Sequence, residues 1–112
     1  MALRLDKPWR PLDAATAGKL PGQLGIYQIA DDGGQVIYIG YAGGRSLFGL
    51  RGKLQDEAAS PRQGAAQFRV EINMQYTTRY LELLMLHKAD HGELPRDNEA
   101  EGAPRLGRLS PA

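Results

Sequence analysis

The sequence GIYQIADDGGQVIYIG occupies residues 25–40 and predicts the central structural unit of the protein. Residues 24–30 and 36–39 are rich in β-branched and aromatic side chains, a composition typical of β-strands. The tetrapeptide DDGG at residues 31–34 separates them, and aspartate and glycine tolerate the positive φ angles that tight turns require. This stretch therefore predicts a β-hairpin.

Capping residues and the spacing of apolar side chains predict the other elements. These are a short helix at 14–17 after the N-cap residue Asp13, a helix at 47–58 after Ser46, a strand at 67–73, and a helix at 78–90 that ends before Gly92. The strand at 67–73 alternates apolar and polar residues, so one face should be buried and the other wet. This order predicts an α+β fold, in which a small three-stranded β-sheet, made of the N-terminal hairpin and one more strand, is flanked by α-helices.

One small domain is expected between two less regular ends. Residues 1–18 should form an N-terminal arm, in which Pro8 and Pro11 interrupt regular structure. Residues 99–112 mix Gly, Pro and Ala without a period, which predicts a flexible C-terminal tail. The domain itself is expected at residues 19–98.

Composition excludes several classes of site. The chain has no cysteine, which rules out disulfides, a thiol nucleophile and cysteine-ligated zinc or iron–sulfur centres. A hydrophobic content of 42% and a charged content of 24% are typical of a soluble globular protein. The longest apolar run, residues 83–86, is too short to cross a bilayer, and the charged, proline-containing N-terminus does not resemble a signal peptide. We therefore expect a cytoplasmic protein with no membrane partner.

Charge is nearly balanced over the whole chain but not along it. The formal net charge is +1, whereas basic residues outnumber acidic ones between residues 41 and 80. A local basic surface can attract phosphate groups even when the whole chain is almost neutral. An ordinary solvated face gives the same pattern, and charge alone favours that interpretation.

Glu82 is the residue that is hardest to explain by packing. It lies in the segment YLELLML, residues 80–86, where apolar side chains cover most of the predicted helix. Desolvating a carboxylate costs several kcal/mol unless a cation or a metal compensates for it. Arg79, one helical turn earlier, is the alternative partner, and in that case Glu82 lies at the edge of the helix.

Arg51 and the histidines of the last helix carry weaker signals. Arg51 lies off the apolar stripe of its predicted helix and could clamp a phosphate, although a solvated arginine has the same pattern. His87 and His91 are spaced i, i+4, which suits a metal, but no third ligand accompanies them in the sequence. Surface histidines near a helix C-terminus are the better interpretation.

The two strand tripeptides begin an ordered set of residues. GIY at 25–27 and YIG at 38–40 are followed by an arginine, a helical glutamate, and an asparagine after a proline. This set resembles the GIY-YIG nuclease superfamily over residues 20–98. The resemblance implies a GIY-YIG-like fold and an endonuclease that hydrolyses the phosphodiester bonds of DNA.

The resemblance also implies roles for individual residues. The catalytic residues that it implies are Tyr27, Tyr38, Arg51 and Glu82. Glu82 would hold one Mg²⁺ or Mn²⁺ ion at the scissile phosphate, a tyrosine would activate the attacking water, and Arg51 would steady the developing charge. The implied substrate is duplex or branched DNA, with RNA as an alternative.

The supporting and substrate-binding residues implied by the same resemblance are Gly40, Tyr41, Arg45, Gln55 and Asn98. Arg45 is the alternative to Arg51, because the loop after Gly40 is longer than is usual in that family. Gln55 stands where many members carry histidine or tyrosine, and glutamine cannot act as a general base. The alternative function is a catalytically weak or inactive module with the same fold that binds nucleic acid or protein. A protein partner and a homodimer are further alternatives.

Overall fold

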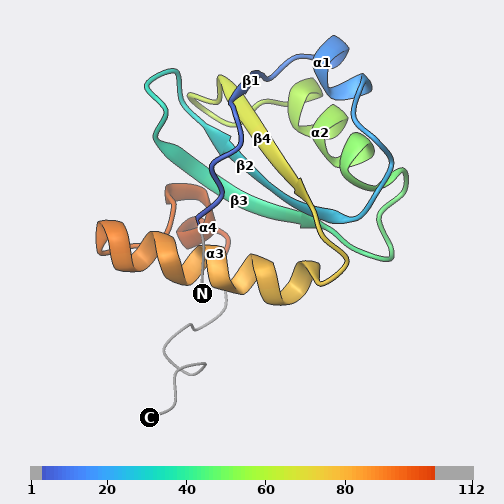
Figure 1. The fold of residues 1–112 in the computed structure, drawn as a ribbon. Coiled ribbons are helices and arrows are strands. Elements are labelled where there is room, and N and C mark those ends of the chain that lie inside the picture. The colour runs from blue at the N-terminus through green and yellow to red at the C-terminus, as the bar shows by residue number, and fades with distance from the viewer. Residues whose placement is uncertain (1–3, 103–112) are drawn as a thin grey trace.

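The computed structural model describes residues 4–102, in which an antiparallel sheet is packed between helices (Figure 1). In chain order the elements are β1 (Arg10–Pro11), α1 (Ala14–Gly18), β2 (Gly25–Ala30), β3 (Val36–Ala42), α2 (Gly49–Ala59), β4 (Gln67–Ile72), α3 (Tyr76–His91) and α4 (Arg96–Ala100). The strands lie in the order β1-β4-β2-β3, so β2 is interior and β3 forms one edge. The α+β fold class is confirmed, but the sheet is 4-stranded where we expected three strands.

The additional strand, β1, comes from the segment that we expected to be an arm. Its residues pair with Phe68 and Gln67 of β4. A strand of 2 residues that ends in proline has no alternating pattern to detect, and proline is tolerated there because β1 is an edge strand. Leu5 is 3% exposed and packs in the core on the α3 side, so residues before 19 contribute to the packed domain.

The predicted hairpin is confirmed. β2 and β3 are antiparallel neighbours, and Tyr27 lies directly opposite Gly40. Asp31 holds the turn, because its Oδ1 accepts hydrogen bonds from the backbone N–H groups of Gly33 at 3.0 Å and Gln35 at 2.9 Å. A side chain that bonds the backbone of its own turn is the mechanism by which aspartate favours turns.

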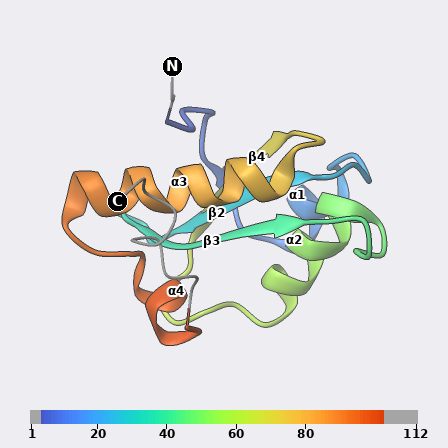
Figure 2. The same ribbon diagram turned by 90° about the horizontal axis from the view of Figure 1, so that it is seen from below.

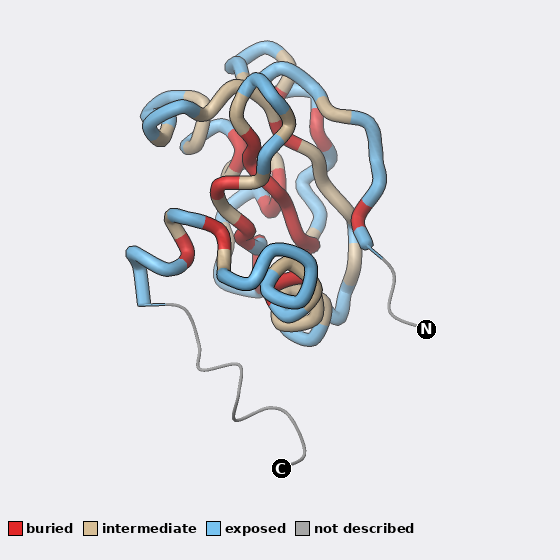
Figure 3. Tube along the Cα trace, turned by 90° about the vertical axis from the view of Figure 1, so that its left-hand side faces the viewer, coloured by how far each residue is buried: buried red, intermediate tan, exposed pale blue. Residues whose placement is uncertain are grey.

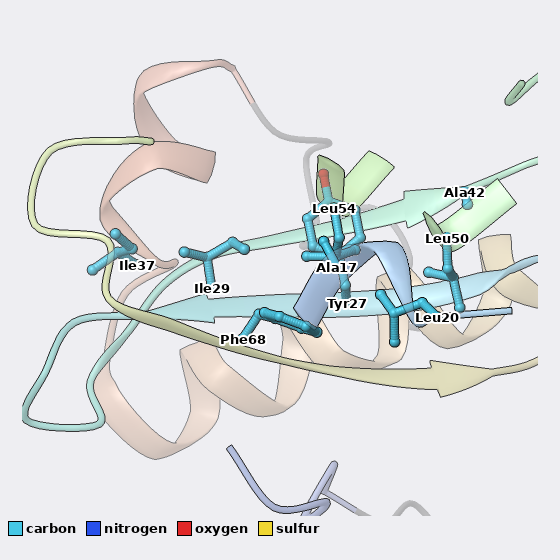
Figure 4. Close-up of a cluster of buried hydrophobic side chains, with 9 residues drawn as sticks. All are labelled: Ala17, Leu20, Tyr27, Ile29, Ile37, Ala42, Leu50, Leu54 and Phe68. Carbon is cyan, nitrogen blue, oxygen red and sulfur yellow. The ribbon is translucent and has the colours of Figure 1, made fainter. Parts of the chain in front are cut away.

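Apolar residues cover both faces of the sheet. α1 and α2 pack on one face and α3 on the other, so that the strands form the middle layer (Figure 2). Among the strands, buried positions concentrate on β2 and β3, in the middle of the molecule (Figure 3). The cluster on the α1–α2 face contains Tyr27 together with Leu50, Leu54 and Phe68 (Figure 4). Strand alternation therefore directs Tyr27 toward α2, whereas its neighbour Ile26 packs on the α3 side.

α2 begins later than expected, and Ser46 does not cap it. The N-cap residue is Phe48, which has a φ angle of 65°. The hydroxyl oxygen of Ser46 instead accepts a hydrogen bond from the backbone N–H of Gly43 at 3.0 Å and closes the preceding loop. The N-cap expected at Asp13 is confirmed, as is the end of α3 before Gly92, where φ is 81°.

α4 is a short helix that the sequence pattern does not predict. Its Asn98 is 2% exposed; the side-chain amide accepts a hydrogen bond from the N–H of Ile39 at 2.8 Å and donates one to the carbonyl of Ile39 at 2.9 Å. α4 takes in the start of the expected flexible tail, and the rest of that tail from residue 103 lies outside the described residues. Within residues 4–102, no helix has both the length and the apolar character needed to span a bilayer.

Candidate functional site

All 5 tyrosines of the chain line one pocket at the β3 edge of the sheet. They are Tyr27, Tyr38, Tyr41, Tyr76 and Tyr80. The pocket has a volume of about 560 Å³ and is completed by the loop after β3 and by one side of α2. We call it the tyrosine pocket. Its phenols offer both aromatic surface and hydroxyl groups to a ligand.

The tyrosines reach this pocket from both faces of the sheet. Tyr27 and Tyr38 pack in the cluster on the α1–α2 face, with ring centroids 6.0 Å apart. The ring of Tyr41 packs instead on α3, 5.6 Å from the ring of Tyr76 and 5.0 Å from that of Tyr80. Because β3 is an edge strand, side chains from its two faces can meet around it.

Gly40 allows the ring of Tyr27 to lie across β3. A Cβ atom at residue 40 would lie 2.5 Å from Cζ and 2.6 Å from the hydroxyl oxygen of Tyr27, and 2.8 Å from Cε2 of Tyr38. No side chain fits at these separations unless the rings move. A cross-strand aromatic ring that covers an edge glycine is a recurring arrangement in sheets. Close packing against both tyrosines therefore explains why residue 40 is glycine.

A carboxylate behind the pocket holds the hydroxyl group of Tyr27. This hydroxyl donates a hydrogen bond to Oε2 of Glu57 at 3.0 Å. Arg62 binds the same carboxylate through Nε at 3.0 Å and Nη2 at 3.1 Å, and its guanidinium carbon lies 3.5 Å from the ring centroid of Tyr38. We call Tyr27, Tyr38, Glu57 and Arg62 the Glu57 cluster. Its mutual contacts fix the orientation of both rings.

Both tyrosines of the Glu57 cluster are protonated at neutral pH. Burial, together with the nearby charge of Glu57, raises the pKa of Tyr27 well above its usual value. Burial likewise raises the pKa of Tyr38 to about 12. Because the hydroxyl group of Tyr27 donates a hydrogen bond to Glu57, its oxygen can still accept a hydrogen bond from a ligand or a water molecule.

Two cations line the tyrosine pocket, and no carboxylate lines it among the described residues. Arg45 comes from the loop after β3 and is exposed, and Lys53 comes from α2 and is half-buried. Neither forms an ion pair within residues 4–102. The loop is fixed to α3, because the hydroxyl oxygen of Tyr76 accepts a hydrogen bond from the N–H of Gly44 at 3.1 Å. Both cations are therefore available to an anionic ligand.

Arg51 and Gln55 do not line the tyrosine pocket. The guanidinium carbon of Arg51 lies 5.9 Å from the ring centroid of Phe48, and a Cβ atom at Gly22 would lie 3.3 Å from its Nη2. Gln55 faces α1, since a Cβ atom at Gly18 would lie 3.6 Å from its Nε2. Between the arginines considered from the sequence, the structure thus places Arg45 beside the tyrosines.

Glu82 also lies away from the pocket lining. Its carboxylate forms a short ion pair with Arg79, which in turn binds Oε2 of Glu71 on β4 through Nε at 2.9 Å. The side chain of Glu82 is 37% exposed. The alternative considered for this residue, an ion pair with Arg79 at the helix edge, is therefore the arrangement observed. We call Glu71, Arg79 and Glu82 the Glu71 cluster.

The carboxylates around Glu82 do not fit the expected Mg²⁺ or Mn²⁺ site. Arg79 contacts the carboxylates of both Glu82 and Glu71, so the nearest possible ligands are already paired with a cation. Among residues 4–102, no group of 3 or more His, Cys, Asp or Glu is arranged so that it could hold a metal ion. No chemical step is therefore assigned to a metal at Glu82.

Several residues of the site were not found from the sequence: Lys53, Glu57, Arg62, Tyr76 and Tyr80. Glu57 contacts Tyr27 across a separation of 30 residues, and no local pattern encodes such a contact. One compositional signal was available, because the chain has 5 tyrosines but only 2 phenylalanines and 1 tryptophan. That bias toward aromatic side chains with a hydroxyl group is consistent with the tyrosine pocket.

Residues 3–90 match the domain of unknown function DUF7508. The chain belongs to the DUF7508 family. No curated protein and no solved structure matches it. The predicted membership of the GIY-YIG nuclease superfamily is wrong, because DUF7508 is the family that is found and no GIY-YIG family matches.

Packing explains the two tripeptides in this DUF7508 domain. A Cβ atom at Gly25 would lie 2.1 Å from the carbonyl oxygen of Glu71 on β4, and Gly40 must accommodate the ring of Tyr27. Isoleucine and tyrosine are in addition common in strands. A hairpin can therefore carry GIY and YIG sequences for reasons of its own packing, which is why the resemblance was misleading.

Proposed function

We propose that this DUF7508 domain binds nucleic acid at the tyrosine pocket, with Arg45 and Lys53 contacting phosphate groups. The observation that carries the proposal is the lining of the pocket, which combines all 5 tyrosines with these two cations and, among the described residues, no carboxylate. Cations bind the phosphate backbone, and aromatic rings stack on bases. The two kinds of group occur here side by side.

The charge distribution indicates how such binding should behave. The formal net charge of the chain is only +1, so attraction of a polyanion must come from the local cations rather than from the protein as a whole. Contacts to few phosphates give modest affinity and a shallow dependence on salt. We therefore expect the affinity to be measurable at low ionic strength and to fall as salt is added.

Fluorescence anisotropy with a labelled single-stranded oligonucleotide, titrated with protein at several salt concentrations, tests the proposal. With about two phosphate contacts, the logarithm of the association constant should fall with the logarithm of salt concentration with a slope of roughly −1.4. Arg45→Ala and Lys53→Ala should each weaken binding roughly 3- to 10-fold and make the slope shallower by about 0.7.

Lys88→Ala is the matched control, because Lys88 is an exposed cation on α3 that does not line the tyrosine pocket. This variant should bind like the wild type. Equal weakening by all three substitutions would indicate diffuse attraction rather than a site. Absence of binding by folded wild-type protein at low salt would overturn the proposal.

Hydrolysis of a bound phosphodiester is a second candidate, favoured by the pairing of Tyr27 with Glu57 at the pocket. A phenol hydrogen-bonded to a carboxylate can take a proton from an attacking water while it gives its own proton to that carboxylate, here Glu57. The test is to incubate a labelled oligonucleotide with the protein, in Mg²⁺ or in EDTA, and to separate the products on a denaturing gel. Cleavage by the wild type but not by Tyr27→Phe supports hydrolysis, and intact oligonucleotide in every lane argues against it.

A further inference from the structure

The tyrosines of the pocket differ in how much of each ring a ligand can reach. Tyr41 is 42% exposed, whereas Tyr27 is 4% exposed and lies in the core. One face of the Tyr38 ring is covered by the guanidinium group of Arg62 at 3.5 Å. Tyr76 and Tyr80 are half-buried and pack on Tyr41. Tyr41 is therefore the ring that offers open aromatic surface.

Tyr41 is also held in place. Its ring lies nearly parallel to that of Tyr76, at 5.6 Å and an interplanar angle of 20°, and the edge contact with Tyr80 is at 5.0 Å and 62°. A ring that is already ordered loses little conformational freedom when a ligand stacks on it. Exposure and rigidity together are the properties of a stacking platform for a planar ligand.

We infer that the tyrosine pocket takes an unpaired nucleotide, whose base stacks on Tyr41 while Arg45 and Lys53 contact the neighbouring phosphates. This inference rests on the proposed function and names its substrate class: single-stranded nucleic acid. Bases inside a duplex are covered on both faces by their neighbours, so a buried base pair has no face to offer to Tyr41. An unpaired base has a free face of its own, which is how proteins that bind single strands stack bases on aromatic side chains.

The pocket has room for such a ligand and gives it charge complementarity. Its volume of about 560 Å³ lies in the range of small-molecule binding sites. Tyr41, Arg45 and Lys53 all line this one cavity, so a base and its phosphate can be bound together. Aromatic stacking does not depend on base identity, and we therefore expect little sequence preference.

The experiment compares a labelled single-stranded 12-mer of DNA, the same sequence in RNA, and the DNA duplex, each titrated with wild type, Tyr41→Ala, Tyr41→Phe and Lys53→Ala. Wild type should bind the single strands more tightly than the duplex. Tyr41→Ala should weaken single-strand binding by about 5- to 150-fold, the range for losing one stacked base, and should change duplex binding little. Tyr41→Phe should keep most of the affinity, because the ring rather than the hydroxyl group stacks. The DNA and RNA arms show which sugar is preferred.

Phe48→Gly is the matched control, since it removes an aromatic ring that is 58% exposed but lies outside the pocket. It should leave single-strand affinity unchanged. One result would overturn the inference and leave the proposed function standing: duplex and single strand bind equally well, Tyr41→Ala does not change the affinity for either, and Lys53→Ala weakens the binding of both. A similar loss in Phe48→Gly and Tyr41→Ala would also overturn it, because stacking would not be specific to Tyr41. If wild type binds none of the three nucleic acids, the proposed function fails, and the inference fails with it.

Discussion

Two arginines of this domain are each held by glutamates, but only one of these clusters reaches the tyrosine pocket. In the Glu71 cluster, Arg79 joins a carboxylate of β4 to one on its own helix. In the Glu57 cluster, Arg62 binds a carboxylate that also accepts the Tyr27 hydroxyl, and it stacks on Tyr38. Both clusters contain an arginine–glutamate ion pair, but only in the Glu57 cluster do tyrosine side chains contact that pair.

The comparison shows that an unusual sequence position and a position beside the candidate site need not coincide. Glu82 stands out because it interrupts an apolar helix, yet a neighbour one turn away satisfies it. Glu57 lies among polar residues near the end of α2, where a glutamate is not unusual. Its side chain is 11% exposed and contacts the pocket through Tyr27. Long-range contacts, and not local patterns, determine which carboxylate lies beside the tyrosine pocket.

The largest effect is expected for Glu57→Ala. This change leaves the hydroxyl group of Tyr27, a residue that is 4% exposed, without its acceptor, and Arg62 keeps only its contacts with Glu101 at 2.8 Å and Asp97 at 3.5 Å. Loss of the buried acceptor should lower the free energy of unfolding by about 2–3 kcal/mol. Urea denaturation followed by circular dichroism measures it. Glu57→Gln should be milder, because an amide oxygen can still accept from Tyr27; equal losses in both variants would argue against this account.

Gly40→Ala should cause the next largest loss of stability, and it tests the packing of the Glu57 cluster without affecting the Glu71 cluster. The added methyl group would lie 2.5 Å from the ring of Tyr27, which Glu57 holds in place. Overpacking of this kind costs about 1–3 kcal/mol of stability. Gly33→Ala is the control, since a Cβ atom there would meet nothing closer than 3.5 Å. Thermal or urea unfolding compares them, and an unchanged Gly40→Ala protein would show that the rings are free to move.

Glu82→Ala should be milder than either change. Arg79 keeps its bond to Glu71 in this variant, and the Glu82 side chain is 37% exposed, so the lost pair is partly screened by water. The free energy of unfolding should fall by about 1 kcal/mol or less. The same urea titration gives the value. If the loss instead equals that of Glu57→Ala, the proposed difference between the two clusters disappears.

The smallest effect at neutral pH is expected for Tyr38→Phe, whose consequence lies in alkaline solution. The pKa of Tyr38 is raised from 10.0 to about 12, so the folded state favours the protonated phenol. Its contribution to stability is fully present below about pH 10 and is lost as pH rises toward 12, because the unfolded chain ionises first. Unfolding titrations at several alkaline pH values should show a smaller decline for Tyr38→Phe than for the wild type. Identical declines would contradict the assignment.

How much of this fold is predictable from the sequence depends on the range of the contacts. Asp31 bonds its own turn, and the sequence of β4 alternates apolar and polar residues, so both elements are visible in local pattern. The burial predicted from that alternation is only partly correct, because Phe68 is buried but Ile72 is 52% exposed. β1 exists only because β4 pairs with it, and α4 is placed by the two hydrogen bonds of Asn98 to β3. Such contacts join distant parts of the chain, and the spacing of apolar residues in the sequence does not predict them.

The site follows the same rule. Tyr27 and Tyr38 were singled out because the hairpin displayed them, and they do line the pocket. Tyr76 and Tyr80 stand one turn apart on α3, where an aromatic residue at helical spacing is indistinguishable from ordinary core. Lys53 resembles any solvated lysine of a helix until the fold brings it beside the tyrosines.

The two hydrogen bonds between Asn98 and Ile39 have a consequence for assembly. The exposed edge of a sheet has unpaired backbone groups with which a strand of another molecule can pair, and natural proteins cover such edges. The amide of Asn98 supplies one acceptor and one donor to the backbone of β3, as a neighbouring strand would, and so pairs with these groups from within the chain. An incoming strand could add at Ile39 only by displacing α4. This single side chain therefore hinders the pairing of another molecule's strand with β3 at Ile39.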